Sequence, residues 1–185
     1  MNKQDIVEYL ARLDRELSGP ATLYLYGSAV PILLDAPDRT SLDIDVAGPY
    51  SKVDQAELEK ASSQAGLPVN PDPLSQANHM EWVGPLRLCL PPPQEGVPGM
   101  KLWQGRRLTV VTGSVPDLVA SKLIRYDETD RADIQFLYTQ FRFEWSDVRK
   151  SVALLPHPFG TDALVLENLD NLQMDMGVWG GGNRA

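Results

Sequence analysis

Two aspartates two positions apart, Asp43 and Asp45, are the residues of this chain best placed by type and spacing to do chemistry. They belong to the stretch SLDIDV, residues 41–46, in which polar and apolar residues alternate. Because strand side chains repeat every two residues, a strand here puts both carboxylates on one face. Neighbouring carboxylates repel each other unless a cation lies between them, so the pair predicts a divalent metal site. Mg²⁺ is the expected ion, because it is commonly held by one or two carboxylates together with substrate phosphates. A solvated acidic edge is the alternative for such a pair alone.

A glycine–serine pair, Gly27 and Ser28, precedes the aspartates along the chain. It follows a predicted buried strand, Thr22–Tyr26, and opens a predicted short helix, Ala29–Leu34, for which Ser28 is the expected N-cap. Backbone N–H groups and a hydroxyl at a helix N-terminus can hold phosphate. A Gly-Ser pair alone is usually only a turn and a cap. Followed by the two aspartates, it predicts a site that holds phosphate at one end and a metal at the other.

This combination resembles the nucleotidyltransferase superfamily, in which a Gly-Ser turn is followed by Asp-x-Asp or Asp-x-Glu. A closer resemblance is to the bacterial nucleotidyltransferase-like proteins of the DUF6036 and AbiEii toxin type. In these an Arg/Thr-rich loop precedes Ser/Thr-x-Asp-Ile-Asp-Val, as in residues 38–46 (DRTSLDIDV) of this chain. Their pattern returns at residues 116–123 (PDLVASKL) and 130–134 (DRADI), so the resemblance covers scattered blocks between residues 20 and 140.

The resemblance implies an enzyme that uses Mg²⁺ and moves a nucleotidyl group from an NTP to an acceptor hydroxyl. Lys122 would contact the nucleotide phosphates, and Asp133 would orient Lys122. A surface ion pair is the alternative for these two residues. The implied catalytic residues are Asp43, Asp45, Lys122 and Asp133, with Asp43 and Asp45 as metal ligands. The implied nucleotide-binding residues are Gly27, Ser28, Ser41 and Lys122.

The resemblance also suggests an RNA acceptor such as tRNA, and a toxin–antitoxin or phage-defence setting with a protein antitoxin as partner. The net charge of -8 and a pI of about 4.7 argue against non-specific coating of nucleic acid, so RNA would have to meet a local basic patch. The clearest basic cluster could contact RNA phosphates from a hairpin, and a solvated hairpin is the alternative. Its members are Arg87, Lys101, Arg106 and Arg107.

A third carboxylate, which many nucleotidyltransferases carry on a later strand, is missing from the predicted strands. Leu86–Leu90 and Arg107–Val111 contain no acid, and Arg87 stands where one would be sought. Because that carboxylate commonly activates the acceptor hydroxyl, the general base stays open between Asp45, Asp133 and the substrate. The alternative hypothesis is a catalytically inactive protein of the same fold that binds a nucleotide or a protein partner.

Cysteine and histidine usage argues against other kinds of site. Cys89 is the single cysteine, which excludes an internal disulfide and a cysteine-rich zinc site, and with only two histidines a zinc centre is not expected. The N-terminus has no apolar signal-peptide core, and no apolar run approaches the roughly 20 residues of a membrane-spanning helix. A cytoplasmic protein with no membrane partner is therefore expected.

The predicted fold is α/β (α+β) of the nucleotidyltransferase type, with a mixed β-sheet flanked by helices and a C-terminal helical extension. The predicted domains are 1–140 for the nucleotidyltransferase-like part, 141–176 for the extension and 177–185 for a flexible tail. The predicted strands are Thr22–Tyr26, Ser41–Val46, Leu86–Leu90, Lys101–Trp103 and Arg107–Val111, with residues 67–83 and 91–99 as loops. The predicted helices are Lys3–Ser18, Ala29–Leu34, Val53–Ala65, Val115–Tyr126, Asp130–Phe141, Trp145–Leu154 and Thr161–Met174.

Overall fold

The computed structural model describes residues 1–72, 75–96 and 99–181, and within it the chain forms two compact units. The first comprises Met1–Leu88 and Pro93–Gly113, and the second comprises Cys89–Pro92 and the chain from Ser114 onward. The predicted boundary after residue 140 differs from this division. The reason is that α4 (Val115–Lys122) packs against α5 (Glu128–Phe141) and α6 (Trp145–Ala153), so these helices form one packed group.

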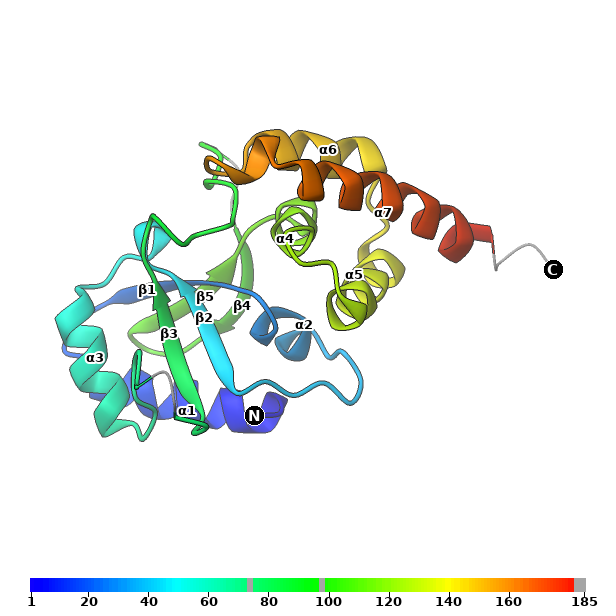
Figure 1. Ribbon diagram of the computed structural model, residues 1–185. Coiled ribbons are helices and arrows are strands. Elements are labelled where there is room, and N and C mark those ends of the chain that lie inside the picture. The colour runs from blue at the N-terminus through cyan, green and yellow to red at the C-terminus, as the bar shows by residue number, and fades with distance from the viewer. Residues whose placement is uncertain (73–74, 97–98, 182–185) are drawn as a thin grey trace. The chain divides into compact units, whose positions relative to one another are not determined.

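The first unit contains a five-stranded sheet in the order β3-β2-β1-β5-β4 (Figure 1). The strands β1 and β5 are parallel, as are β2 and β3, whereas β1 pairs with β2 and β4 pairs with β5 in antiparallel fashion. The predicted mixed sheet and the predicted hairpin are thus confirmed. The strand bounds are β1 (Ala21–Tyr26), β2 (Asp43–Ala47), β3 (His79–Val83), β4 (Met100–Gln104) and β5 (Leu108–Thr112).

Three helices accompany this sheet in the first unit: α1 (Lys3–Glu16), α2 (Ala29–Leu33) and α3 (Gln55–Gln64). Helix α1 begins with a capping box, in which Asn2 and Asp5 each accept the other's backbone N–H, at 3.0 and 2.8 Å. Its apolar stripe is fully buried and the helix contacts α3 and β5, so the stripe forms core. A short 3₁₀ turn, η1 (Gly48–Tyr50), follows β2.

One predicted strand is wrong, and one observed strand lies in a predicted loop. Residues 86–90 do not form a strand: residues 85–87 form a turn, in which the N–H groups of Arg87 and Leu88 both donate to the carbonyl of Gly84 at 3.1 Å. The strand at the edge of the sheet is instead β3, which pairs with β2 along its whole length. Prolines at positions 68, 71 and 73 predicted irregular structure here, but the last of them precedes His79, the first residue of β3, by six residues.

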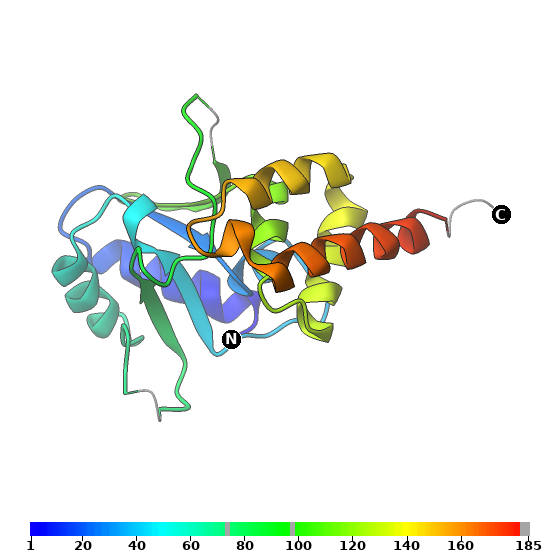
Figure 2. The same cartoon turned by 45° about the horizontal axis from the view of Figure 1, so that its top comes forward.

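The second unit consists of α4 to α6, the 3₁₀ turn η2 (Phe159–Thr161) and α7 (Ala163–Gly181). Figure 2 shows α6 and α7 side by side, and the indole N–H of Trp145 on α6 donates to the Leu169 carbonyl of α7 at 3.0 Å. Helix α7 continues past the predicted end at Met174, so the segment expected as a tail is helical as far as Gly181, and residues 182–185 lie outside the described part. Among the described helices, none is long and apolar enough to cross a membrane.

Candidate functional site

The two predicted aspartates lie on β2 as the alternation predicts. Ile44 and Val46 are completely buried, while Asp43 and Asp45 are partly exposed. The hydroxyl of Ser41 donates to Asp43 Oδ1 at 2.7 Å and holds that carboxylate at the start of the strand. The structure therefore brings Ser41 and Asp43 together. The Ser41 hydroxyl, which was predicted to bind nucleotide, donates its hydrogen bond to a carboxylate of the protein.

Gly27 lies directly against Asp45. A Cβ built on Gly27 would overlap Asp45 Oδ2, and the glycine has a φ of +68°, in the left-handed region that other residues adopt at a cost. The turn after β1 thus needs a glycine for two independent reasons. The glycine turn and the Asp-x-Asp strand, which were predicted to belong to one site, therefore lie side by side, with the Gly27 backbone against the Asp45 carboxylate.

Ser28 occupies the N-cap position of α2, as the sequence predicts, but its side chain does not cap the helix. Its backbone is already helical, with φ -71° and ψ -26°, and its side chain makes no capping hydrogen bond to α2. Its Oγ instead accepts a hydrogen bond from Arg39 Nη2 at 3.2 Å. Arg39 belongs to the loop that leads into β2, so this contact joins the glycine–serine turn to the aspartate strand from a second direction.

An acid does stand on a later strand of the sheet. Glu81 lies at the centre of β3, which runs parallel to β2 with Asp43 opposite His79 and Asp45 opposite Glu81. Ligand atoms of Asp43, His79 and Glu81 all lie within 4.8 Å of one another. The predicted absence of a third carboxylate was wrong, because the search was confined to residues 86–90 and 107–111. The short stretch His79-Met80-Glu81 between turn residues was the signal available.

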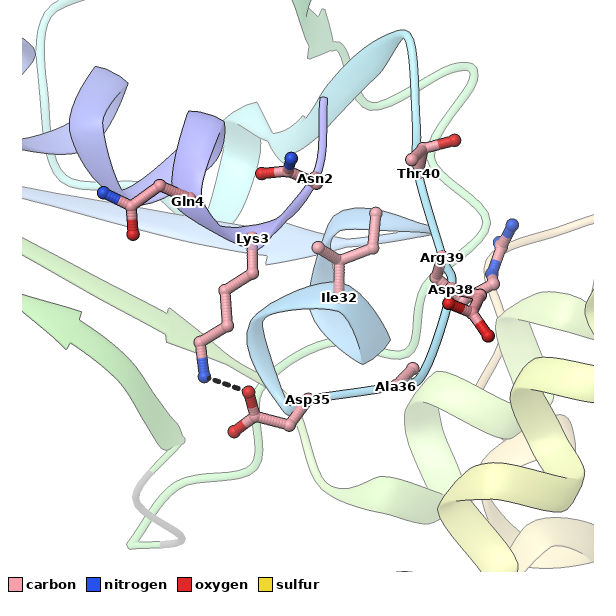
Figure 3. A pocket seen from close by; sticks show the side chains of 9 residues that line it. All are labelled: Asn2, Lys3, Gln4, Ile32, Asp35, Ala36, Asp38, Arg39 and Thr40. Atoms are coloured by element: carbon pink, nitrogen blue, oxygen red, sulfur yellow. Dashed lines mark hydrogen bonds and ion pairs between the residues drawn. The ribbon is translucent and has the colours of Figure 1, made fainter.

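A hollow of about 600 Å³ lies beside the loop that carries Arg39 (Figure 3). The ion pair between Lys3 Nζ and Asp35 Oδ1, 2.7 Å long, links the start of α1 to the turn after α2. Positively and negatively charged side chains therefore both line this hollow. The lining residues are Asn2, Lys3, Gln4, Ile32, Asp35, Ala36, Asp38, Arg39 and Thr40.

Lys122 and Asp133 lie together in the second unit. The Lys122 ammonium is 2.8 Å from Asp133 Oδ2 and 3.3 Å from Asp130 Oδ1, and all three side chains are at most 6% exposed. Arg125 donates to both carboxylate oxygens of Asp130, at 2.9 and 3.0 Å. This bidentate bond and the nearby acids raise the pKa of the Arg125 guanidinium. Asp130 and Arg125 were not singled out in the sequence, although Asp130 lies within the motif DRADI.

The side chains of the predicted basic cluster make different contacts in the structure. Arg87 forms an ion pair with Glu81, and Arg107 donates to the carbonyls of Arg15 and Leu17 at the end of α1. Lys101 and Arg106 are exposed on β4 and on the hairpin turn. The side chains of Arg87 and Arg107 thus already make contacts within the first unit.

Comparison of this chain with protein-family models, with characterised proteins and with solved structures finds no match in any of the three.

Proposed function

We propose that this protein is a metal-dependent nucleotidyltransferase. The observation that supports it most is the convergence of Asp43 and Glu81 from paired parallel strands, beside an Asp45 carboxylate that lies against the Gly27 turn. Carboxylates grouped at one edge of a sheet next to a glycine turn suit a reaction at phosphorus, where charge neutralisation and alignment supply most of the rate. In that reaction an acceptor hydroxyl oxygen bonds to the α-phosphorus, and the bond to the pyrophosphate oxygen breaks.

The donor set fits a divalent cation. Asp43 and Glu81 offer carboxylate oxygens that face each other, and they would hold the ion, with Mg²⁺ as the expectation from the sequence. When bound, such an ion neutralises phosphate charge and orients the reacting oxygens. Asp45, held against Gly27, lies two residues along β2 from Asp43, on the same face, and is the candidate to take the proton of the acceptor hydroxyl. The Gly27–Ser28 turn would approach the NTP phosphates.

Lys122 and Asp133 enter the proposal through the sequence resemblance. Their 2.8 Å contact supports Asp133 as the residue that positions Lys122. The same contact, together with Asp130, also describes a buried structural ion pair. A charge-neutral Lys122→Met variant that folds but does not transfer would support the phosphate role.

RNA is the proposed acceptor, and the residues proposed to contact its phosphates are Arg87, Lys101, Arg106 and Arg107, of which the first three are exposed. The proposed pairing with a protein antitoxin rests on the sequence resemblance alone.

The test is label transfer from each of four α-³²P-labelled NTPs to total RNA, with the full chain and with Mg²⁺ or Mn²⁺ present. Transfer should occur with the wild type and vanish in Asp43→Asn and Glu81→Gln. The matched control is Glu59→Gln, an exposed acid on α3 of the same unit, which should transfer normally. NTP binding without transfer to any acceptor would instead favour the inactive, nucleotide-binding alternative.

A further inference from the structure

The cluster formed by Asp43, His79 and Glu81 contains a nitrogen donor as well as oxygen donors. It arises from the parallel register of β2 and β3, in which Asp43 is directly opposite His79 and Glu81 is two residues further on the same strand. Side chains two apart on one strand share a face, so all three point to the same side of the sheet. Their ligand atoms lie within 4.8 Å of one another, a spacing that one ion bonded to all three can span.

The ring of His79 is held in the state that a metal needs. Its Nδ1 is 3.0 Å from the Ala77 carbonyl, and because a carbonyl can only accept, Nδ1 must carry the hydrogen. A neutral imidazole then has its lone pair on Nε2. Metal-binding histidines characteristically donate their second ring N–H to a backbone carbonyl in this way, which sets the tautomer and the ring orientation. This contact lies outside the cluster and is independent of the two carboxylates.

Both carboxylates are also held from outside the cluster. Ser41 Oγ donates to Asp43 Oδ1 at 2.7 Å, and Arg87 Nη2 donates to Glu81 Oε1. Each bond occupies one oxygen of its carboxylate. Supporting contacts of this kind restrict the orientation of metal ligands and tune their affinity.

We propose that Asp43, His79 and Glu81 bind one divalent first-row transition metal, with His79 Nε2 as the ligand that makes the site prefer Mn²⁺, Co²⁺ or Zn²⁺ to Mg²⁺. Mg²⁺ takes oxygen ligands and keeps much of its water, whereas imidazole is a good ligand for the transition metals. The site therefore departs from the Mg²⁺ expected from the sequence. Its use in catalysis rests on the proposed nucleotidyl transfer, but its existence and its metal preference do not.

The test uses Mn²⁺ as the probe, on the full chain and without nucleotide. Mn²⁺ binding is followed by EPR, and pulsed EPR detects nitrogen directly bonded to the ion. The wild type should bind one Mn²⁺ with a nitrogen coupling, and more than a tenfold excess of Mg²⁺ should be required to displace it. His79→Gln should lose the nitrogen coupling and most of the preference over Mg²⁺.

The matched control is His157→Gln, which changes the only other histidine of the chain, an exposed residue in the second unit. It should keep the coupling and the affinity. Ser41→Ala keeps all three ligands and should weaken Mn²⁺ binding by about tenfold, as loss of a supporting contact does. Circular dichroism of each variant confirms that it is folded. If His79→Gln does not fold, His79→Asn with ¹⁵N-labelled wild type as reference gives the same comparison.

Absence of Mn²⁺ binding, a nitrogen coupling that survives in the His79 variant, or displacement by equimolar Mg²⁺ would each overturn the proposal. Mn²⁺ binding with nitrogen coupling but without nucleotidyl transfer would support this site and contradict the proposed function. Transfer that runs equally well with Mg²⁺, without nitrogen coupling, would do the reverse.

Discussion

The two units each contain a cluster of acidic side chains, and the clusters differ in the side chains that lie beside the carboxylates. In the second unit the Lys122 ammonium lies between Asp130 and Asp133, and Arg125 binds Asp130 as well. In the first unit Asp43 and Glu81 face the imidazole of His79. In the second unit a buried ammonium of the chain lies between the carboxylates, whereas in the first unit the exposed Arg87 pairs with Glu81 from outside and the atoms that face one another are possible metal ligands.

The two clusters also differ in burial, and the one in the second unit is the more buried. Asp130, Asp133 and Lys122 are at most 6% exposed, whereas the Glu81 side chain is 23% exposed and Asp43 and His79 are also partly accessible. A buried charged group is tolerated only when it is paired, because its desolvation is expensive. A partly exposed group of ligands can exchange an ion with solvent. This difference in burial is what the proposed roles require: the buried cluster would serve stability, and the accessible cluster would serve metal binding.

The largest effect is expected from Lys122→Met, which keeps an unbranched side chain of similar length and removes its charge. Two buried carboxylates would lose their shared cation, so the free energy of unfolding should fall by about 3–5 kcal/mol. Urea unfolding followed by circular dichroism measures it. Lys150→Met is the control, since Lys150 is exposed and pairs with Asp147 three residues earlier, and it should cost less than about 1 kcal/mol. A Lys122 variant as stable as the control would contradict the view that the cluster of the second unit stabilises the fold.

Metal addition should stabilise the first unit. At a Mn²⁺ concentration about 100 times the Kd, binding to the folded state alone should raise the free energy of unfolding by about 2.7 kcal/mol. Excess EDTA should reverse the gain, and Asp43→Asn should abolish it. Thermal melting with and without Mn²⁺ measures the shift. An equal shift of the melting temperature in the Asp43 variant would mean that Mn²⁺ binds at another site.

Asp14 provides a carboxylate of the first unit that accepts three hydrogen bonds from backbone N–H groups. It accepts N–H groups of Arg106, Arg107 and Leu108 at 3.1, 2.7 and 2.7 Å, joining α1 to the β4–β5 hairpin. Asp14→Ala leaves these donors without their acceptor and should cost about 2–3 kcal/mol at neutral pH. Mn²⁺ should stabilise this variant as much as the wild type, because Asp14 is not one of the proposed ligands.

The contribution of Asp14 should also depend on pH. Partial burial opposes ionisation, but the three N–H donors outweigh it and hold the pKa of Asp14 below its usual value. Because the pKa is lower in the folded state, the stabilisation is present above the unfolded-state pKa of about 3.9 and is lost as the pH falls through the folded-state value. The stability gap between wild type and Asp14→Ala should therefore shrink below about pH 4. A gap that is constant with pH would contradict this assignment.

The smallest effect is expected from Asp43→Asn in metal-free protein. Removing one of two neighbouring carboxylates relieves repulsion with Glu81, so the free energy of unfolding should change by less than about 1 kcal/mol, in the stabilising direction. Chemical unfolding in EDTA measures it. A loss as large as that expected for Lys122→Met would mean that both clusters serve stability.

Local patterns and a recognised motif predicted much of the first unit and one contact of the second. The alternation around Asp43 and Asp45 placed both on one face of a strand, since the two-residue repeat depends only on strand geometry. Gly27 was expected in a turn, and the hairpin of β4 and β5 was predicted within a few residues. The motif that contains Asp133 was singled out with Lys122, and the two side chains are in contact. Each of these depends on short-range geometry or on a recognised motif.

Long-range pairing accounts for what was missed. His79 and Glu81 reach Asp43 because β3 pairs in parallel with β2, and a parallel pair requires a crossover connection that includes α3. Nothing within the few residues of β3 specifies its partner strand. The same holds for Arg39, whose bond to Ser28 joins a loop to a turn. It holds also for the end of α7 beyond Met174, where Asp175 accepts hydrogen bonds from Tyr126 and Arg131 of distant segments.

The sequence by itself determined the chemical types available to this protein: two aspartates on one strand face, a glycine turn before them, and a lysine with a downstream aspartate on helices. Side-chain periodicity and backbone preferences are local, so they could be read from neighbouring residues. Only the tertiary structure decided that Glu81 and His79 stand beside Asp43 and that Lys122 lies between two buried carboxylates. Those neighbours are brought together by strand register and helix packing, which depend on residues far apart in the chain.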